Sequence, residues 1–171
     1  MVTIRPENDF DFKDIRLVNT VAFGQKNEAD LVDALRETDN YIKELSFVAE
    51  LEGRVVGHIL FSKIEIQTES GMVPALSLAP MAVRPEYQGQ GIGSKLIEHG
   101  LRECEQRGHK IIVVIGHPEY YIRFGFGQAK PRGLDVTFDV PDEAFMVIEL
   151  VAGALKGAKG TVKFPKEFDE V

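Results

Sequence analysis

PEYQGQGIGSKL, residues 85–96, places three glycines at alternate positions where one sequence pattern gives way to another. Residues 72–83 before it form an apolar run typical of a strand, and residues 92–108 repeat apolar side chains at helical spacing. A strand that passes through glycines into a helix presents unpaired backbone N–H groups and the positive end of the helix dipole. Because glycine carries no Cβ, an anion can approach this backbone closely. The junction therefore predicts a phosphate site.

The glycine spacing distinguishes three kinds of phosphate-binding loop. A dinucleotide loop needs G-x-G-x-x-G, whereas Gly89, Gly91 and Gly93 are spaced G-x-G-x-G, with no suitable acidic residue ending a following strand. A nucleoside-triphosphate loop ends in Gly-Lys-Ser/Thr, but residues 93–95 read Gly-Ser-Lys. The pattern Gln/Arg-x-x-Gly-x-Gly/Ala of a coenzyme A pyrophosphate loop matches Gln88, Gly91 and Gly93. A glycine-rich connection without a ligand is the alternative to all three.

The remaining patterns predict one α/β domain over residues 1–171. Strand-like runs cover residues 2–5, 46–51, 55–67, 72–83, 111–115 and 144–150. Helical spacing covers residues 11–23, 28–37, 92–108 and 118–126. This order predicts a mixed, mostly antiparallel sheet of about six to seven strands flanked by helices, and a right-handed strand–helix–strand crossover over residues 76–115.

Composition excludes several classes of protein. The net charge of −7 opposes binding to extended nucleic acid and favours a cationic or amine-bearing ligand. No apolar run is long enough to cross a bilayer, and the first residues lack the features of a signal peptide, so we expect a cytoplasmic protein without membrane contact. The single cysteine, Cys104, and four histidines without ligand spacing predict neither a disulfide framework nor a metal site.

Two stretches carry a resemblance to a known family. LAPMAVRPEYQGQGIGSKLIEHGL, residues 78–101, resembles the signature of the GNAT N-acetyltransferase superfamily. YYIRFGF, residues 120–126, looks like the second landmark of that family, Tyr-x-x-x-Gly-Phe, here Tyr121, Gly125 and Phe126. The resemblance covers nearly the whole chain and is strongest to a bacterial-type branch of predicted acetyltransferases with uncharacterised substrates. It implies acetyl-CoA as cosubstrate and a V-shaped cleft where the fourth and fifth strands splay apart.

The resemblance also implies where acetyl-CoA binds. The pantetheine arm would pair with the backbone of residues 81–83, and the pyrophosphate would lie on the N–H groups of residues 88–94. The cofactor-binding residues predicted in this way are Met81, Ala82, Val83, Gln88, Gly89, Gln90, Gly91, Ile92, Gly93 and Ser94. Pro80 cannot donate a ladder hydrogen bond and predicts a bulge or an edge beside them. Arg84 and Lys95 are electrostatic helpers in this scheme, and for Arg84 a solvated surface charge is the alternative.

Acetyl transfer to an amine needs an acid for the leaving thiolate and a base for the amine. By resemblance the acid is Tyr121, because a tyrosine hydroxyl is protonated near neutral pH; packing is its alternative role, and Tyr120 is a substitute donor. Many relatives carry a glutamate on the strand before the glycine loop, but residues 72–83 contain no acid. Glu28 and His117 are the candidate bases, with a helix-start acid and a loop histidine as their alternatives.

These observations predict an acetyl-CoA-dependent N-acetyltransferase that transfers the acetyl group directly to a primary amine. A non-catalytic acyl-CoA-binding or sensor domain is the alternative, supported by the absent strand glutamate, and an interaction module with a structural glycine loop is a third. The sequence leaves open whether the acceptor is a small amine, a peptide terminus or a lysine, and residues before 47 should shape its pocket. We expect His58 to be a hydrogen-bonded sheet histidine and Cys104 a packed thiol. Dimerisation is common in the superfamily, so a homodimer is compatible with the resemblance.

Overall fold

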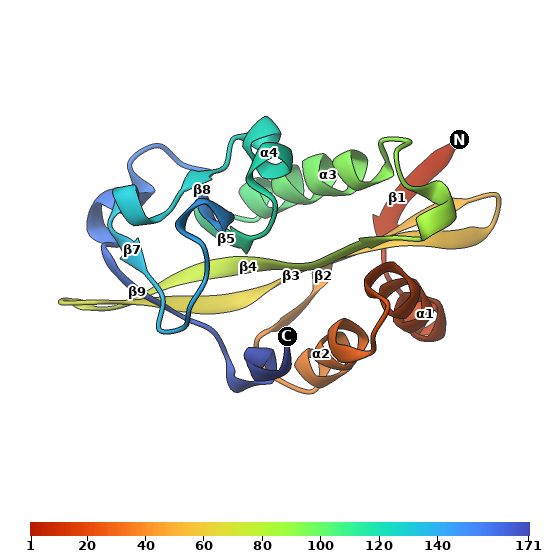
Figure 1. The fold of residues 1–171 in the computed structure, drawn as a ribbon, viewed down its shortest axis with the longest axis horizontal. Helices are drawn as coiled ribbons and strands as arrows, with labels where there is room; N and C mark the ends of the chain where they lie inside the picture. The colour runs from red at the N-terminus through yellow and green to blue at the C-terminus, as the bar shows by residue number, and fades with distance from the viewer.

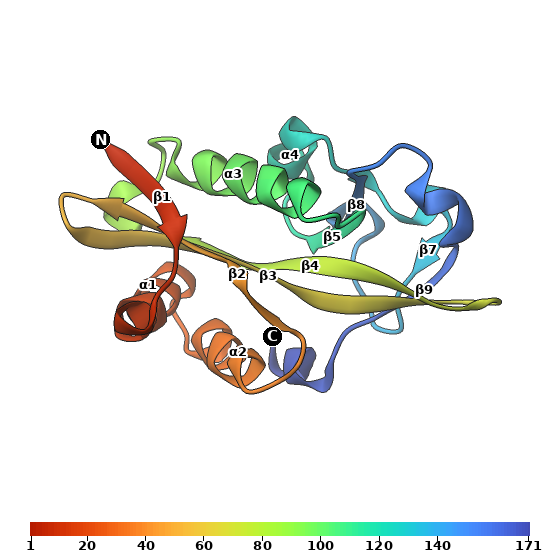
Figure 2. The same ribbon diagram turned by 180° about the vertical axis from the view of Figure 1, so that it is seen from behind.

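A nine-stranded sheet divides the helices into two layers in the computed structural model, which describes residues 1–171 (Figures 1 and 2). The strands are β1 (Val2–Pro6), β2 (Tyr41–Leu51), β3 (Arg54–Thr68), β4 (Gly71–Val83), β5 (Ile111–Ile115), β6 (Gly127–Gln128), β7 (Leu134–Asp135), β8 (Phe145–Glu149) and β9 (Gly160–Lys163). The helices are α1 (Phe12–Phe23), α2 (Asn27–Arg36), α3 (Ile92–Gln106) and α4 (Pro118–Tyr121). Helices α1 and α2 cover one face of the sheet, and α3 and α4 cover the other.

The sheet has the predicted mixed and mostly antiparallel character. Its main path is β1-β2-β3-β4-β5-β8-β6, and β9 pairs with both β3 and β7. Only the β4–β5 and β7–β9 pairs are parallel, and α3 connects β4 to β5 as the strand–helix–strand pattern predicts. The six long strands and all four helices were predicted. Strands β6, β7 and β9 were not, because two to four residues are too few to show an alternating pattern.

Strand β4 has an irregularity at the predicted position and loses its outer partner beside it. Along the β3–β4 pair, Ile59 lies opposite Met81 but Phe61 lies opposite Leu78, so β4 accommodates one extra residue next to Pro80. On the other side, β4 pairs with β5 only at residues 76 and 77. The predicted splaying of these two strands is therefore confirmed, and the outer edge of β4 has no strand partner after residue 77.

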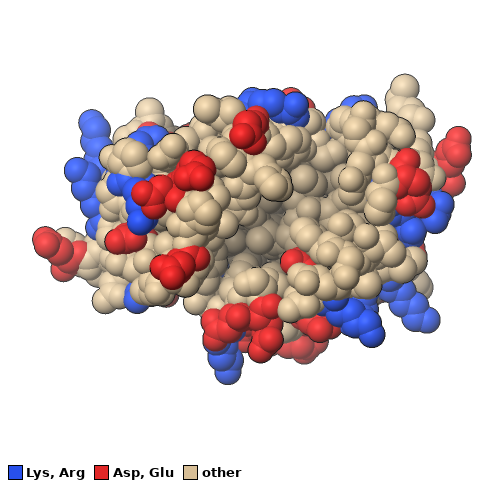
Figure 3. All heavy atoms as spheres, in the orientation of Figure 1, with Lys and Arg blue, Asp and Glu red and all other residues tan.

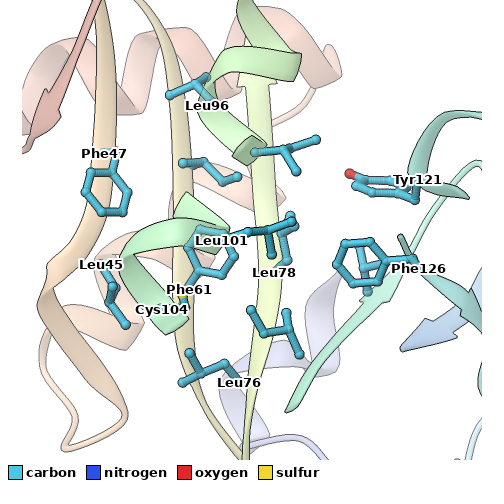
Figure 4. Packing of buried hydrophobic residues seen from close by; sticks show 14 of the residues in the cluster. Leu45, Phe47, Phe61, Leu76, Leu78, Leu96, Leu101, Cys104, Tyr121 and Phe126 are labelled. Atoms are coloured by element: carbon cyan, nitrogen blue, oxygen red, sulfur yellow. The ribbon is translucent and has the colours of Figure 1, made fainter. Parts of the chain in front are cut away.

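Helix α3 packs on the sheet through the face that its spacing predicted (Figure 4). The buried residues on that face are Ile92, Leu96, Ile97, Leu101 and Cys104. Gly100 lies between them, and a Cβ at this position would overlap the ring of Phe61 on β3. Cys104 is fully buried, and burial raises the pKa of its thiol to about 12, so it is an unreactive packed thiol as expected.

The opposite face of the sheet contains a buried polar network around His58 of β3. The amide of Asn19 in α1 donates from Nδ2 to His58 Nδ1 over 3.1 Å, so His58 carries its hydrogen on Nε2. That hydrogen is donated to Ser46 Oγ over 3.0 Å, and the Ser46 hydroxyl donates to the Glu7 carboxylate. The expectation of a hydrogen-bonded sheet histidine is confirmed. The network fastens α1 to the sheet through side chains that are all fully or nearly fully buried.

The negative charge in this network is balanced from α2. Arg36 donates to both oxygens of Glu7 over 3.1 and 3.2 Å, and the Tyr41 hydroxyl adds a hydrogen bond of 2.8 Å. The Glu7 carboxylate thus accepts hydrogen bonds from Arg36, Tyr41 and Ser46. One of its oxygens also lies 3.9 Å from His58 Nε2. Burial, and secondarily the positive charge of Arg36, lower the pKa of His58 to about 3. His58 is therefore neutral in the folded protein at neutral pH.

Stability should fall as the pH drops below 6.5, the ordinary pKa of a histidine. His58 then binds a proton in the unfolded chain but not in the folded protein. The free energy of unfolding therefore falls by about 1.4 kcal/mol per pH unit, and by about 2 kcal/mol at pH 5. The loss continues towards pH 3. Denaturant unfolding of the wild type and His58→Gln at pH 7 and pH 5 would measure it: the variant should be less stable at pH 7 but lose less stability on acidification.

The same measurement can contradict this account, because the other acid-sensitive group nearby titrates in a different range. The hydrogen bond from Arg5 lowers the pKa of Asp11 below its usual 3.8, so Asp11 contributes only at more acidic pH. An equal loss between pH 7 and pH 5 in the wild type and in His58→Gln would show that His58 is not the responsible group.

Candidate active site

A cleft of about 570 Å³ opens where β4 separates from β5. Four segments line it: the end of α1, the end of β4, the glycine loop with the start of α3, and the segment that begins with α4. The lining residues are Ala22, Phe23, Met81, Ala82, Val83, Tyr87, Gln88, Gly89, Gly91, Ile92, Gly93, Ser94, Tyr120 and Arg123. Figure 3 shows the face with its hollow in the middle; the walls there are mostly uncharged, and acidic side chains gather below it. The cleft brings together all but one of the predicted cofactor-binding residues; Gln90 does not line it.

The glycine loop leaves a series of backbone donors free. Gly89 and Gly91 have φ values of +79° and +82°, in the left-handed region that favours glycine, and nothing lies within 4 Å of a Cβ built on either. The first helical hydrogen bond of α3 runs from Lys95 N–H to Gly91 over 3.1 Å. No backbone N–H of residues 89–94 donates to an acceptor within the protein. The first turn of α3 also contains no acid, so this end of the helix is suited to an anion.

Gln88 has a different part in the loop from the one predicted. Its backbone N–H donates to Pro85 over 3.3 Å and is not free for a ligand. Its side-chain amide donates to the Val83 carbonyl over 2.9 Å, which ties the loop back to the end of β4. The free donors therefore begin at residue 89 rather than at residue 88.

Arg84 is neither a solvated charge nor part of the cleft lining. Its side chain is buried, and Nε donates to the Val55 carbonyl over 3.1 Å. The guanidinium thus stabilises the connection between β3 and the loop. The sequence shows a charged residue after a strand but cannot show this acceptor, which lies 29 positions earlier in the chain.

Two adjacent tyrosines of α4 occupy different environments. Tyr120 lines the cleft, and its hydroxyl lies 2.7 Å from the position that a Cβ on Gly93 would occupy. Tyr121 is buried, with its ring 5.2 Å from that of Tyr120 and 5.8 Å from that of Phe126. Gly116 makes room for this ring, since its Cβ would lie 2.5 Å from Tyr121 Cε2.

The hydroxyl of Tyr121 has no partner within the protein, and Tyr121 is not among the residues that line the cleft. Figure 4 shows the hydroxyl pointing away from its own segment, towards α3 and β4. Burial, with a smaller contribution from Tyr120, raises its pKa above the usual value of 10.0, so the hydroxyl keeps its proton at neutral pH.

Neither candidate base lines the cleft. Glu28 lies in the first turn of α2, where its carboxylate accepts hydrogen bonds of 3.1 and 3.2 Å from Gln25. His117 is exposed at the start of α4, and its carbonyl accepts the N–H groups of Tyr120 and Tyr121. Glu28 follows Phe23, a cleft residue, by one short loop, and His117 precedes Tyr120 by three residues. Both residues are thus close in sequence to residues that line the cleft, but their own side chains do not line it.

Four lining residues were missed in the sequence: Ala22, Phe23, Tyr87 and Arg123. Tyr87 and Arg123 lie inside the two stretches that carry the family resemblance, so their positions could have drawn attention to them. Ala22 and Phe23 end an ordinary amphipathic helix, and no local pattern shows that this end reaches β4. No group of three or more His, Cys, Asp or Glu side chains is placed to hold a metal ion. None of the helices is long and apolar enough to span a membrane.

Comparison with known proteins gives consistent matches. A family model described as acetyltransferase (GNAT) domain matches residues 3–129. The uncharacterized N-acetyltransferase YjhQ of Escherichia coli is 42% identical over 134 residues, which cover 78% of this chain and 74% of the relative. A second uncharacterized N-acetyltransferase of E. coli, YhbS, is 32% identical over 166 residues, covering 97% of this chain and 98% of the relative.

Solved structures extend these matches to the fold. The crystal structure of E. coli YhbS in complex with CoA has a TM-score of 0.91 and 32% identity, covering 98% of this chain and 92% of the other. A GNAT family acetyltransferase from Brucella melitensis in complex with acetyl-CoA has a TM-score of 0.81 and 32% identity, with 99% of each chain covered. Both similar structures thus hold coenzyme A or its acetyl thioester.

Proposed function

Because this chain belongs to the GNAT family of acetyltransferases, we propose that it transfers the acetyl group of acetyl-CoA directly to a primary amine, with Tyr121 as the general acid. The observation that carries the proposal is the set of free backbone donors at residues 89–94, which lie at one end of a cleft with an unpaired strand edge along its side. The donors suit a pyrophosphate, and the strand edge suits the amide-containing pantetheine arm.

In this arrangement acetyl-CoA would extend along β4. The pyrophosphate would accept hydrogen bonds from residues 89–94, and the arm would pair with the free edge of residues 81–83 as an added strand. The thioester would then lie deeper in the cleft, in the direction of Tyr121. Ala22 and Phe23 from α1 would form the wall on the acceptor side.

The chemistry requires three kinds of assistance. The amine attacks the thioester carbon, the carbonyl oxygen becomes an oxyanion, and the C–S bond breaks to release the thiolate of coenzyme A. A backbone N–H near Val83 would stabilise the oxyanion, and the Tyr121 hydroxyl would donate its proton to the leaving sulfur. Its lack of a protein acceptor supports this role, because the proton is not engaged elsewhere.

The amine must lose a proton before or during its attack. Glu28 and His117 stay predictions for this step, and because neither lines the cleft, each would act through water. The acidic side chains below the hollow in Figure 3 would favour the approach of a cationic acceptor.

The test is release of free coenzyme A thiol from acetyl-CoA in the presence of three acceptors: a small alkyl amine, a peptide with a free N-terminus, and a peptide with an internal lysine. We expect saturable, amine-dependent release with at least one of them. Binding of acetyl-CoA without release by any amine would favour the acyl-CoA sensor. Failure to bind acetyl-CoA at all would refute both functions and leave the glycines as architecture.

A further inference from the structure

The guanidinium of Arg123 lies at the start of α3 without an acidic partner. Its Nη2 donates to Ser94 Oγ over 3.1 Å, which joins the segment after α4 to the first turn of α3. Its central carbon lies 4.8 Å from the centre of the Tyr120 ring and 5.5 Å from that of Phe124. Arg123 forms no ion pair, whereas Arg5, Arg16, Arg36 and Arg132 all bind carboxylates.

This placement is unfavourable for the protein alone. The N-terminal end of a helix is positive, and a cation there is repelled by the helix dipole. No acid in the first turn of α3 offsets the charge, and Lys95 adds a second positive charge to the same turn. The stacked aromatic rings hold the guanidinium in place. Positive charge is thus concentrated at one side of the cleft, beside the free N–H groups of residues 89–94.

The contact with Ser94 leaves further donors for an anion. Because Ser94 Oγ accepts from Arg123, the hydrogen of its own hydroxyl stays free to donate. The remaining N–H groups of the guanidinium are also free, because the contact with Ser94 uses only one of the N–H donors of this planar group. Arg123, the Ser94 hydroxyl and the Ser94 N–H therefore present donors to the same end of the cleft, from two segments that are 29 positions apart in the chain.

We propose that Arg123 binds the pyrophosphate of coenzyme A next to the backbone donors of the glycine loop. The inference rests on the proposed position of the pyrophosphate on residues 89–94. A guanidinium can donate two hydrogen bonds to one phosphate, and Arg123 would add these to the hydrogen bonds from the backbone of the loop. Since Arg123 follows Tyr121 by two residues, the same contact fastens the segment that carries the general acid when the cosubstrate is bound.

Coenzyme A carries a second anionic group, its 3′-phosphate, and a series of thioesters distinguishes the two. Acetyl-CoA has both groups, acetyl-dephospho-CoA keeps only the pyrophosphate, and acetyl-pantetheine has neither. Arg123→Ala is compared with Arg123→Lys, which keeps the charge but not the planar fork. The matched control is Arg102→Ala, which removes the same charge from an exposed position of α3 outside the cleft lining.

For Arg123→Ala, we expect kcat/KM to fall about tenfold with both acetyl-CoA and acetyl-dephospho-CoA, in line with the loss of a charge-assisted hydrogen bond, and to be unchanged with acetyl-pantetheine. Arg123→Lys should fall between this variant and the wild type, and Arg102→Ala should match the wild type. Calorimetric titration with coenzyme A and dephospho-coenzyme A should show the same tenfold loss of affinity.

Three outcomes would overturn the assignment. A loss confined to acetyl-CoA would place Arg123 on the 3′-phosphate, an equal loss with acetyl-pantetheine would show a structural role, and no loss with any thioester would remove Arg123 from binding. Failure of the proposed loop site itself is distinguishable, because the wild type would then bind coenzyme A and dephospho-coenzyme A no more tightly than pantetheine.

Discussion

Tyr121→Phe is expected to lower kcat by about 10²-fold or more while changing the affinity for acetyl-CoA by less than about twofold. The hydroxyl forms no hydrogen bond within the protein, so its removal leaves no buried partner unsatisfied, and the ring can keep its contacts with Tyr120 and Phe126. The loss should therefore fall on the chemical step. Steady-state release of coenzyme A and calorimetric titration measure the two quantities separately.

Tyr120→Phe is the matched control, because it removes the same group from the adjacent residue. Tyr120 lines the cleft beside Gly93, at the end proposed for the pyrophosphate, so its loss should affect binding more than turnover. If Tyr120→Phe lost turnover and Tyr121→Phe kept the wild-type kcat, the roles of the two tyrosines would be reversed. Equal wild-type rates in both variants would exclude a tyrosine acid.

Gly91→Glu should weaken binding of coenzyme A by at least about 100-fold. The substitution places a carboxylate beside the free N–H groups of residues 89–94, where it would repel a pyrophosphate and occupy its donors. The left-handed φ of +82° adds strain of about 1 kcal/mol or more, so stability must be measured together with affinity. Calorimetric titration and denaturant unfolding of the same preparation provide both values.

Gly108→Glu controls for this strain and for the added charge. Gly108 follows the other end of α3, has a φ of +87°, and has nothing within 4 Å of a Cβ built on it. The variant should lose at least as much stability, because a carboxylate is unfavourable near the C-terminal end of a helix, but it should bind coenzyme A like the wild type. If both variants lost binding equally, the effect of Gly91→Glu would be one of folding, and the proposed cradle would lack support.

Local patterns accounted for most of the fold. The long strands, α3 and the glycine loop could be predicted because alternation, helical spacing and the left-handed glycines are properties of neighbouring residues. The bulge beside Pro80 could be predicted because proline lacks the ladder donor wherever it occurs. One boundary was wrong: the start of β2 was predicted five residues too late, because Lys43 and Glu44 interrupt the apolar run before Ser46.

The unpredicted parts of the candidate site depend on contacts between distant segments. Arg123 has its partner in α3, and Arg84 has its acceptor in β3. Phe23 reaches the cleft because α1 is held on the sheet by apolar packing and by the polar network around His58. A single sequence records none of these distances. It identified the loop from its own glycines, but not the side chains that face that loop.

The position of the remaining β4–β5 pairing has a mechanical consequence. The C-terminal strands join the N-terminal ones at residues 76–77 of β4 and, through β9, at residues 65–67 of β3, which lie towards the same end of the sheet. The two parts of the sheet are thus joined at the closed end of the cleft and separate from there. A small rotation where the two parts meet would change the distance between residues 89–94 and Arg123, which the hydrogen bond from Arg123 to Ser94 joins at the other end. Substitutions at residues 76–77 of β4 would therefore alter the affinity for a ligand that these residues do not contact.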